Sequence, residues 1–335
     1  MGNIKNICVI GDGGWGTTLA ILLARKGFNT TIWGAFPDYV EILRKTRENI
    51  KFLPAVKIPN DVKITSDLEE ALRGKDLIIL AVPSQHMRSV LEMLKLHDLS
   101  GKVFVSVTKG IETSSLKRMS EVIGEMLGDI HLAVLSGPTI ALEVANGAPT
   151  TAVIACEDMG LARQLQEIFM TEHFRIYASD DITGVELGGS LKNIIAIAAG
   201  ALDAMAYGTK AKAALLTRGL VEIVRMGVAM GARRETFYGL SGLGDLTTTC
   251  ISQYSRNRWF GEEIGRGLKM ADILKQTDMV IEGAATTKSA YELSRKYGVE
   301  MPITEEVYKV LYEGKNPKKA VHDLMTRPSK IESEP

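Results

Sequence analysis

Short apolar runs rich in β-branched residues alternate with helical patterns through the first half of the chain. Runs that are apolar on both faces are typical of a parallel sheet covered by helices on both sides. One helix start has a capping-box pattern, with Ser66 as the expected N-cap and Glu69 three residues later. We therefore predict a doubly wound α/β domain. Its strands are expected within residues 6–11, 30–34, 76–83, 102–110, 131–138, 150–156 and 174–179.

The pattern changes after about Ser179. Strand-like runs disappear, and segments rich in Ala, Leu and Met with helical spacing continue to the end of the chain. We expect an α/β domain over residues 1–179 and an all-α domain over residues 180–335. The helices of the second domain are predicted at residues 186–206, 212–231, 258–268, 270–276, 286–298 and 303–314.

The composition is that of an ordinary globular protein, since 45% of the 335 residues are hydrophobic and 24% are charged. Forty basic residues balance forty acidic ones, so the chain carries no net charge at pH 7. A general affinity for nucleic acid or anionic membranes needs a basic excess or a basic stripe, and the sequence has neither. We expect no nucleic-acid partner, and an anionic ligand must be bound by a local cluster.

The most apolar stretch, residues 193–206, is interrupted by Asp203 and is shorter than the ~20 residues that span a bilayer. No charged-then-apolar leader opens the chain, so we expect a cytoplasmic protein without a membrane span. The 3 cysteines lie far apart without metal-ligand or disulfide spacing, and the 5 histidines are scattered. We expect reduced cysteines and no metal site.

Four glycines stand within six positions directly after the first predicted strand: Gly11, Gly13, Gly14 and Gly16. A strand, GxGxxG and a helix form a dinucleotide-binding pattern, in which the glycines allow a tight turn, close approach of a pyrophosphate and helix–strand packing. We expect a dinucleotide at the helix N-terminus, where free N–H groups favour anions. Trp15 in the same loop either covers the cofactor or caps the core.

The end of the second predicted strand bears on the choice of cofactor. An NAD enzyme usually has an acid there for the ribose hydroxyls, and an NADP enzyme has an arginine for the 2′-phosphate. This chain has Trp33-Gly34-Ala35-Phe36, and its first acid is Asp38. The sequence leaves NAD or NADP open, and we expect measurable activity with both.

Lys192 stands in a small-residue, apolar stretch whose helix is predicted to be buried nearly all round. Burial of an ammonium group lowers its pKa toward the range useful for proton transfer. Lys192 is therefore the candidate catalytic acid/base. The alternative is a lysine whose aliphatic stem reaches along the surface to put the charge in water.

Other segments supply groups that an anionic substrate needs. Lys109 lies just beyond the carboxyl end of a predicted strand, on the side where open α/β sheets bind ligands. Ser255, Arg256 and Asn257 stand at a predicted helix start, which predicts a phosphate site or else a capped helix with a solvated arginine. Asp245 lies in a glycine-rich segment and is predicted either to orient the substrate or the lysine, or to be part of an ordinary turn.

With these motifs the chain resembles the bacterial NAD(P)-dependent glycerol-3-phosphate dehydrogenase family. The resemblance runs from about residue 6 to about residue 314, and its most specific motifs are SGPTIA, LKNIIAI and GLGDL with SRN. It implies a Rossmann-like sheet domain followed by an all-α domain. It also implies reversible, NAD(P)H-dependent reduction of dihydroxyacetone phosphate to sn-glycerol 3-phosphate, which supplies phospholipid synthesis.

The resemblance assigns roles to individual residues. Lys192 is implied to donate the proton in reduction and to accept it in oxidation. The substrate-binding positions that it implies are Lys109, Gly137, Thr139, Lys192, Asp245, Ser255, Arg256 and Asn257. The cofactor-binding positions that it implies are Gly14, Trp15, Ala35, Lys109, Ala141, Arg256, Val280 and Glu282, in addition to the motif glycines Gly11, Gly13 and Gly16.

Two positions depart from the family pattern. The family often has serine at the position of Gly14, and a basic residue or histidine at that of Ala35. Without that basic side chain, a strong preference for NADP is not expected. Two alternatives stay open: a hydroxy-acid or hydroxyacyl dehydrogenase of similar build, and a non-catalytic dinucleotide-binding redox sensor. A homodimer is one possible oligomeric state.

Overall fold

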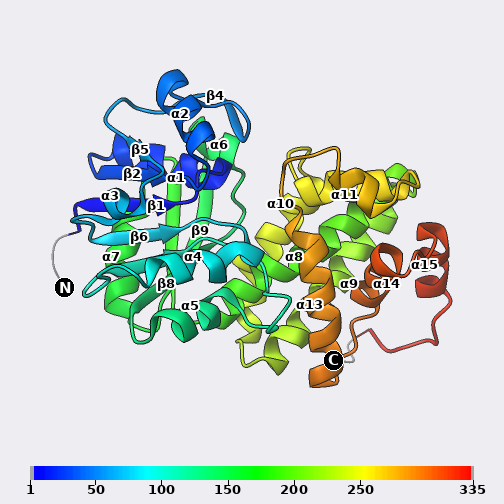
Figure 1. The fold of residues 1–335 in the computed structure, drawn as a ribbon. Helices are drawn as coiled ribbons and strands as arrows, with labels where there is room; N and C mark the ends of the chain where they lie inside the picture. The colour runs from blue at the N-terminus through cyan, green and yellow to red at the C-terminus, as the bar shows by residue number, and fades with distance from the viewer. Residues whose placement is uncertain (1–3, 333–335) are drawn as a thin grey trace. The chain divides into compact units, whose positions relative to one another are not determined.

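The computed structural model describes residues 4–332, and the chain divides into two compact units, each described here by itself (Figure 1). The sheet unit contains the chain up to Thr108 and the segment Met119–Ile182. The helical unit contains Lys109–Arg118 and the chain from Thr183 onward. The segment Lys109–Arg118 follows a strand of the sheet unit in sequence but packs with the helices.

The sheet unit is built on an eight-stranded sheet in the order β10-β9-β8-β7-β6-β1-β2-β5. All seven expected strands are present. Strand β5 and the short antiparallel pair of β3 and β4 were not predicted from the sequence. Most neighbouring strands pair parallel, and β8 and β9 pair antiparallel, which the apolar runs did not indicate. The strands are β1 (Asn6–Ile10), β2 (Asn29–Trp33), β3 (Glu48–Asn49), β4 (Leu53–Lys57), β5 (Lys63–Thr65), β6 (Leu77–Leu80), β7 (Val103–Ser106), β8 (His131–Ser136), β9 (Thr150–Ala155) and β10 (Phe174–Ser179).

Both faces of this sheet are buried, as the continuous apolar runs predicted. On β1, Ile7 and Val9 belong to one hydrophobic cluster and Cys8 and Ile10 to another, because alternate side chains of a strand point to opposite faces. The first cluster packs under α1 (Gly14–Arg25), α2 (Pro37–Thr46), α6 (Ala141–Ala145) and α7 (Met159–Phe169). The second packs under α3 (Leu68–Leu72), α4 (Met87–Leu94) and α5 (Met119–Leu127). The predicted doubly wound fold is confirmed.

The start of α3 differs from the capping-box prediction. Its N-cap is Asp67, whose side chain accepts a hydrogen bond from the backbone N–H of Glu70, and not Ser66. Both residues can cap a helix, so the sequence pattern alone did not fix the register.

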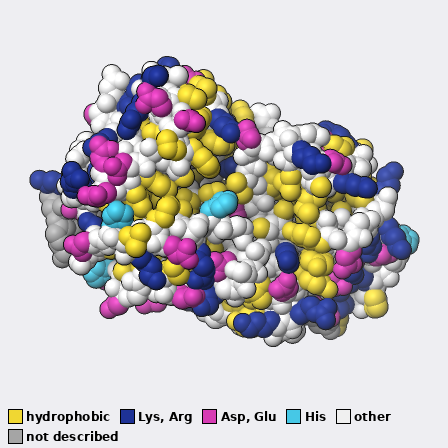
Figure 2. Space-filling view, in the orientation of Figure 1, with side chains coloured by type: hydrophobic (Ala, Val, Ile, Leu, Met, Phe, Trp, Pro, Cys, Tyr) yellow, Lys and Arg dark blue, Asp and Glu magenta, His cyan; other side chains and the backbone are white. Residues whose placement is uncertain are grey.

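Within residues 4–332, the helical unit contains the six predicted helices and two α-helices that the sequence pattern did not predict, α10 and α15. Its central helix α8 is apolar and long enough to cross a membrane, but 89% of its most apolar window is buried inside the protein, as in a core helix. Charged side chains of both signs are interspersed over the face drawn in Figure 2. The helices are α8 (Ile182–Ala204), α9 (Gly208–Ala229), α10 (Asp245–Ile251), α11 (Arg256–Gly265), α12 (Met270–Leu274), α13 (Glu282–Tyr297), α14 (Pro302–Tyr312) and α15 (Pro317–Met325).

Glycines let other segments approach α8 more closely than any side chain would allow. A Cβ on Gly200 would lie 1.9 Å from the carbonyl oxygen of Arg258, and one on Gly261 would lie 1.9 Å from that of Ile197. Likewise a Cβ on Gly188 would lie 2.5 Å from the carbonyl oxygen of Ser241. These contacts bring α11 and the turn before α10 against the helix that carries Lys192.

Candidate active site

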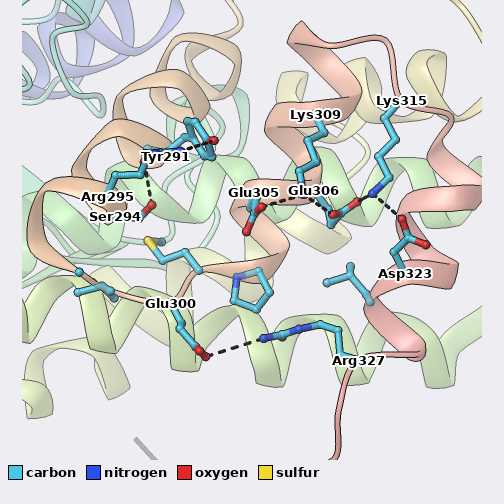
Figure 3. Close-up of a pocket in the computed structure, with 15 residues that line it drawn as sticks. Tyr291, Ser294, Arg295, Glu300, Glu305, Glu306, Lys309, Lys315, Asp323 and Arg327 are labelled. Atoms are coloured by element: carbon cyan, nitrogen blue, oxygen red, sulfur yellow. Dashed lines mark hydrogen bonds and ion pairs between the residues drawn. The ribbon is translucent and has the colours of Figure 1, made fainter.

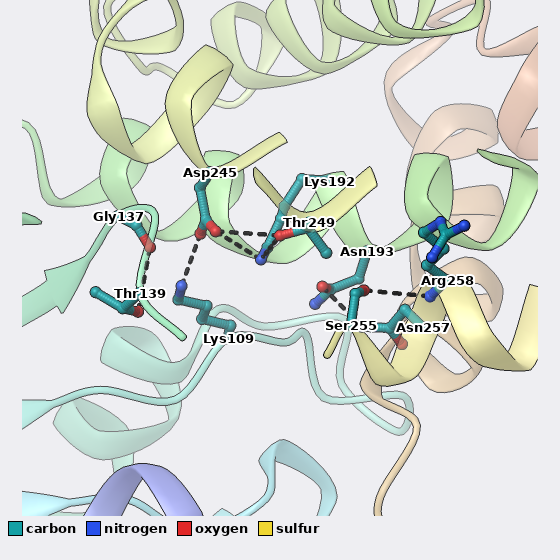
Figure 4. Close-up of polar contacts among 10 residues, drawn as sticks. All are labelled: Lys109, Gly137, Thr139, Lys192, Asn193, Asp245, Thr249, Ser255, Asn257 and Arg258. Carbon is teal, nitrogen blue, oxygen red and sulfur yellow. Dashed lines mark hydrogen bonds and ion pairs between the residues drawn. The ribbon is translucent and has the colours of Figure 1, made fainter. Parts of the chain in front are cut away.

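The ammonium group of Lys192 lies inside the helical unit and not at its surface. Lys192 is 6% exposed, and its Nζ lies 2.7 Å from Oδ1 of Asp245, with the hydroxyl of Thr249 as a further partner (Figure 4). The alternative of a lysine that extends into water is therefore wrong for this chain. Its charge is balanced by a buried carboxylate, which is the arrangement that a buried charge needs.

Asp245 joins two lysines. Its Oδ2 lies 2.7 Å from Nζ of Lys109, while Oδ1 contacts Lys192, and Asp245 itself is only 1% exposed. Figure 4 shows both ammonium groups directed at the one carboxylate. One carboxylate thus contacts two ammonium groups. Such a cluster favours an anionic substrate and a negative charge that develops during a reaction.

Burial sets the proton affinity of this cluster. Removal of the ammonium from water, together with the smaller effect of the positive charge of Lys109, lowers the pKa of Lys192 to about 8. The carboxylate of Asp245 acts in the opposite direction because it favours the charged lysine. A lysine with a pKa close to neutral can both release and accept a proton under working conditions.

The local fold explains how Asp245 reaches Lys192. The turn Leu240–Gly244 has π-helical geometry and approaches α8 at Gly188, one helical turn before Lys192. Asp245 then opens α10, so the prediction that it lies in a glycine-rich loop is corrected to the first position of a helix. A carboxylate in the first helical turn is also favoured by the helix dipole.

Thr249 is a further residue of this cluster that was not predicted from the sequence. Its hydroxyl contacts Lys192 and lies 3.2 Å from Oδ1 of Asp245. Residues four apart on a helix lie on the same face, so a predicted helix starting at Asp245 would have indicated Thr249.

The SRN segment lies at the start of α11. Ser255 is the N-cap, and its hydroxyl accepts a hydrogen bond from the backbone N–H of Arg258. Asn257 is buried and links two elements, because its Nδ2 donates to Oδ1 of Asn193 at 2.9 Å and its Oδ1 accepts from the N–H of Gly283 at 2.9 Å. Asn193 follows Lys192 directly on α8. The helix start is thereby tied to the neighbour of the candidate acid/base.

The two arginines of this segment have different surroundings. Arg258 forms ion pairs with Asp203 and Glu262, at 2.8 Å each, and is held within the helical unit. Arg256 is exposed, and no salt bridge of its side chain is found within residues 4–332. The carboxylate of Glu282, the first residue of α13, acts on it electrostatically. Arg256 is thus available for a ligand phosphate, and Val280, two residues before Glu282, is 39% exposed.

In the sheet unit the glycine motif has the geometry of a dinucleotide cradle. Gly11 has φ +117°, and a Cβ there would lie 2.7 Å from the carbonyl oxygen of Ala81. A Cβ on Gly16 would lie 2.2 Å from the carbonyl oxygen of Gly11, so this glycine is needed for helix packing. Gly13, by contrast, has open space within 4 Å of its Cβ position, and no side chain within the described chain caps α1. The residues therefore fit a pyrophosphate at the helix start.

The neighbours of this cradle clarify two predicted positions. Gly14 opens α1, and its Cβ position lies 3.8 Å from the Cβ of Ala141, the first residue of α6. A Cβ on Gly14 would also lie 2.5 Å from the carbonyl oxygen of Phe52, which explains the absence of a side chain here. Trp15 packs edge-on against Phe174, with ring centroids 6.3 Å apart, and so supports the core.

Three other predicted positions also belong to the sheet unit. Ala35 is exposed beyond the end of β2. Gly137 follows β8 with φ +144°, and a Cβ there would lie 2.8 Å from the Cα of Ala152. The N–H of Thr139 donates to the carbonyl oxygen of Gly137 at 2.7 Å, which forms a tight loop before α6 (Figure 4).

A hollow of about 610 Å³ lies elsewhere, among α13, α14, α15 and the chain that follows (Figure 3). None of the predicted site residues lines it. Its charged groups are paired with one another, as in the contacts Lys309–Glu305, Lys315–Asp323 and Arg327–Glu300. Within residues 4–332 no group of three or more His, Cys, Asp or Glu side chains could hold a metal ion.

A dinucleotide cradle on a doubly wound sheet and a buried lysine held on a carboxylate define the class, a nicotinamide-dependent dehydrogenase. Family models described as the N-terminus and the C-terminus of NAD-dependent glycerol-3-phosphate dehydrogenase match residues 6–162 and 181–322. The chain belongs to this family. The resemblance inferred from the motifs is confirmed.

Individual relatives are similar to this chain over nearly its whole length. The glycerol-3-phosphate dehydrogenase, NAD(P)+, of Prosthecochloris aestuarii is 49% identical over 329 residues, which cover 97% of this chain and 99% of the relative. That of Syntrophotalea carbinolica is 50% identical over 98% of this chain and 99% of the relative. The solved glycerol-3-phosphate dehydrogenase of Coxiella burnetii is 37% identical, with a TM-score of 0.94 over 97% of this chain and 99% of that one.

Proposed function

We propose that the chain catalyses the reversible reduction of dihydroxyacetone phosphate to sn-glycerol 3-phosphate, with NADH or NADPH as the hydride donor. Two findings support this reaction: the chain belongs to the family, and it is similar over nearly its whole length to relatives named glycerol-3-phosphate dehydrogenase. The observation that carries the chemistry is the buried ammonium of Lys192 on the carboxylate of Asp245.

Lys192 is the proton donor of the reduction. When the substrate carbonyl carbon gains a hydride, its oxygen becomes negatively charged and needs a proton. An N–H bond of Lys192 breaks as the new O–H bond forms, which leaves a neutral amine; oxidation reverses both changes. Asp245 fixes the position of the ammonium, and Lys109 adds the positive charge that favours the anionic substrate.

The substrate phosphate needs a cationic side chain that forms no salt bridge within the described chain. Arg256 meets this requirement at the start of α11, where helix N–H groups also favour anions. Ser255 and Asn257 fix this helix start. The family motifs add Gly137 and Thr139 as substrate contacts.

The nicotinamide cofactor, when bound, supplies the hydride. Gly11, Gly13, Gly14 and Gly16, with the first turn of α1, would hold its pyrophosphate. The family motifs add Trp15, Ala35, Lys109, Ala141, Arg256, Val280 and Glu282 as further contacts.

The test is the absorbance of the nicotinamide band of NADH or NADPH after addition of dihydroxyacetone phosphate. Consumption that depends on enzyme and substrate supports the proposal. A cofactor that binds without turnover would indicate a redox sensor. Turnover of a 2-keto acid or a hydroxyacyl thioester, without that of dihydroxyacetone phosphate, would indicate the other dehydrogenase class.

We extend the proposal to the setting of the enzyme: a cytoplasmic protein that supplies glycerol 3-phosphate to phospholipid synthesis. Cys8, Cys156 and Cys250 are buried free thiols, which suits a reducing compartment. The proposed assembly is a homodimer, and light scattering coupled to size-exclusion chromatography tests it.

A further inference from the structure

The end of β2 lacks the acid that an NAD enzyme uses to bind the adenosine ribose. Gly34 is the first residue after this strand, and its N–H donates to the carbonyl oxygen of Thr65 at 3.1 Å. The residue at this position would carry the acid in the usual NAD pattern. Another group must therefore face the ribose if the chain binds NAD.

The glycine loop places another carboxylate at this point. The N–H of Gly11 donates to the carbonyl oxygen of Trp33 at 2.9 Å, which ties the loop to the end of β2. The next residue in the loop is Asp12. A Cβ on Gly34 would lie only 2.5 Å from Oδ2 of Asp12, so the carboxylate of Asp12 occupies the space of the missing side chain.

Asp12 is held there without a donor for its buried oxygen. The backbone oxygen of Asp12 accepts from Nδ2 of the fully buried Asn49 at 2.8 Å, which fixes the loop. Oδ2 is buried and has no hydrogen-bond partner within residues 4–332. Desolvation raises the pKa of Asp12, and its own backbone N–H and the charge of Lys51 oppose this effect only in part. The side chain as a whole is half-buried, and rotation about its terminal torsion can present either oxygen to a ligand hydroxyl.

The basic residues of α2 and its C-cap are engaged elsewhere. Arg44 donates from Nε to the carbonyl oxygen of Ile64 at 2.7 Å, and Lys45 pairs with Glu41 at 3.4 Å. Arg47 donates to the carbonyl oxygen of Val62 at 2.9 Å. Each of these side chains thus has a partner within the protein.

The groups that act electrostatically on Asp12 belong to two segments. Lys51, in the segment between β3 and β4, lowers the pKa of Asp12 and so favours its ionised form. Tyr39, on α2, has a raised pKa, chiefly from burial and in small part from the charge of Asp12. A negative carboxylate at the end of β2 would accept hydrogen bonds from ribose hydroxyls and repel a phosphate.

We propose that Asp12 replaces the missing acid of the second strand: its carboxylate binds the hydroxyls of the adenosine ribose and disfavours a 2′-phosphate, so the chain prefers NADH to NADPH. This inference rests on the proposed function, because it requires a dinucleotide in the glycine cradle. It assigns the choice of cofactor to a residue of the glycine loop.

The test is calorimetric binding to the whole protein of ADP-ribose and of its 2′-phosphorylated form, at one ionic strength. The parent should bind ADP-ribose at least about tenfold more tightly, and Asp12→Asn should reduce that ratio by about tenfold because it removes the charge at constant size. Asp12→Ala is the second variant. Asp38→Asn is the matched control, since it removes an equal charge from the exposed first turn of α2, and it should leave the ratio unchanged.

Equal binding of the two ligands by the parent would overturn the assignment, even if neither Asp12 variant folds. A ratio that Asp38→Asn changes as much as Asp12→Asn would also overturn it, because general charge would then explain the preference. If the parent binds neither ligand, the dinucleotide cradle and the proposed function fail as well. Binding of both ligands with equal affinity leaves the proposed function intact.

Discussion

Two buried ionisable groups of the helical unit have opposite surroundings. Glu222 on α9 is 2% exposed, and its two carboxylate oxygens accept hydrogen bonds from the backbone N–H groups of Ile303 and Thr304, at 2.6 and 3.1 Å. The hydroxyl of Thr304 donates a third bond at 3.1 Å. These donors lie in the first turn of α14, so Glu222 caps that helix from outside. Lys192 instead contacts a carboxylate that also binds a second lysine.

The partners distinguish Glu222, whose role is to stabilise the fold, from Lys192, which can take part in a reaction. The partners of Glu222 are two amides and a hydroxyl, which do not titrate near neutral pH, so its hydrogen bonds serve to join α9 to α14. Lys192 has titratable partners, and an ammonium has three donors that substrate atoms can share. Burial alone therefore does not indicate function, whereas the chemistry of the partners does.

The largest expected effect is that of Lys192→Met. It removes the proton but keeps the length of the side chain, so kcat for reduction should fall by about 10²–10⁴-fold while the protein stays folded. Lys309→Met is the control, because Lys309 also contacts carboxylates but lies at the hollow of α13–α15. Steady-state rates and thermal unfolding measure both variants, and near-normal turnover of Lys192→Met would assign the proton transfer to another group.

Glu222→Ala should lower stability and leave the rate unchanged, the reverse of what is expected for Lys192→Met. It leaves three buried donors without their acceptor, so the free energy of unfolding should fall by about 2–4 kcal/mol. The value of kcat per folded molecule should stay close to that of the parent. Denaturant unfolding and active-site titration separate the two quantities, and a selective loss of kcat without loss of stability would refute the structural role.

Glu222 also predicts a pH dependence of stability. The effect of burial on the pKa of Glu222 outweighs that of its hydrogen-bond donors and raises this pKa to about 7. The folded state therefore binds the proton more tightly than the unfolded state does. Its contribution to stability is therefore present at low pH and is lost as the pH rises through about 7. The difference in unfolding free energy between the parent and Glu222→Ala should shrink between pH 5 and pH 8, and a difference that grows would contradict the assignment.

A smaller effect is expected at the start of α11. Arg256→Ala should raise KM for dihydroxyacetone phosphate by about 10–100-fold, the value of a charge-assisted hydrogen bond, with little change in thermal stability. Arg258→Ala should instead lower stability, because Arg258 is paired with Asp203 and Glu262. If dihydroxyacetone without its phosphate is reduced as efficiently by the parent, Arg256 is not the phosphate anchor.

The sequence predicted those parts of the fold that depend on local pattern. Seven of the eight strands of the sheet and six helices of the second unit follow from the apolar pattern. The reversed direction of β9 and β10 does not, because a buried strand has the same apolar pattern in either direction. Helix α10 was also missed, since the glycines before Asp245 indicate a turn and the π-helical segment has no distinct sequence signal.

For the candidate site, the sequence indicated the residue types but not their contacts. An isolated lysine in an apolar helix was sufficient to single out Lys192. Its partner Asp245 is 53 residues away in sequence, and the contact depends on close packing at Gly188. Glu222 and Asp12 were not identified because their partners are backbone groups and an unfilled glycine position, which only the folded chain shows.

The most direct test of the central claim is the pH dependence of kcat/KM in both directions. Reduction requires Lys192 protonated and oxidation requires it neutral, and its pKa lies at about 8. For reduction, kcat/KM should therefore fall as the pH rises through about 8, while for oxidation it should rise through the same value and then level off. Both changes should disappear from the residual activity of Lys192→Met. Profiles that are flat between pH 7 and pH 9, or that change in the same direction for both reactions, would contradict a proton transfer by Lys192.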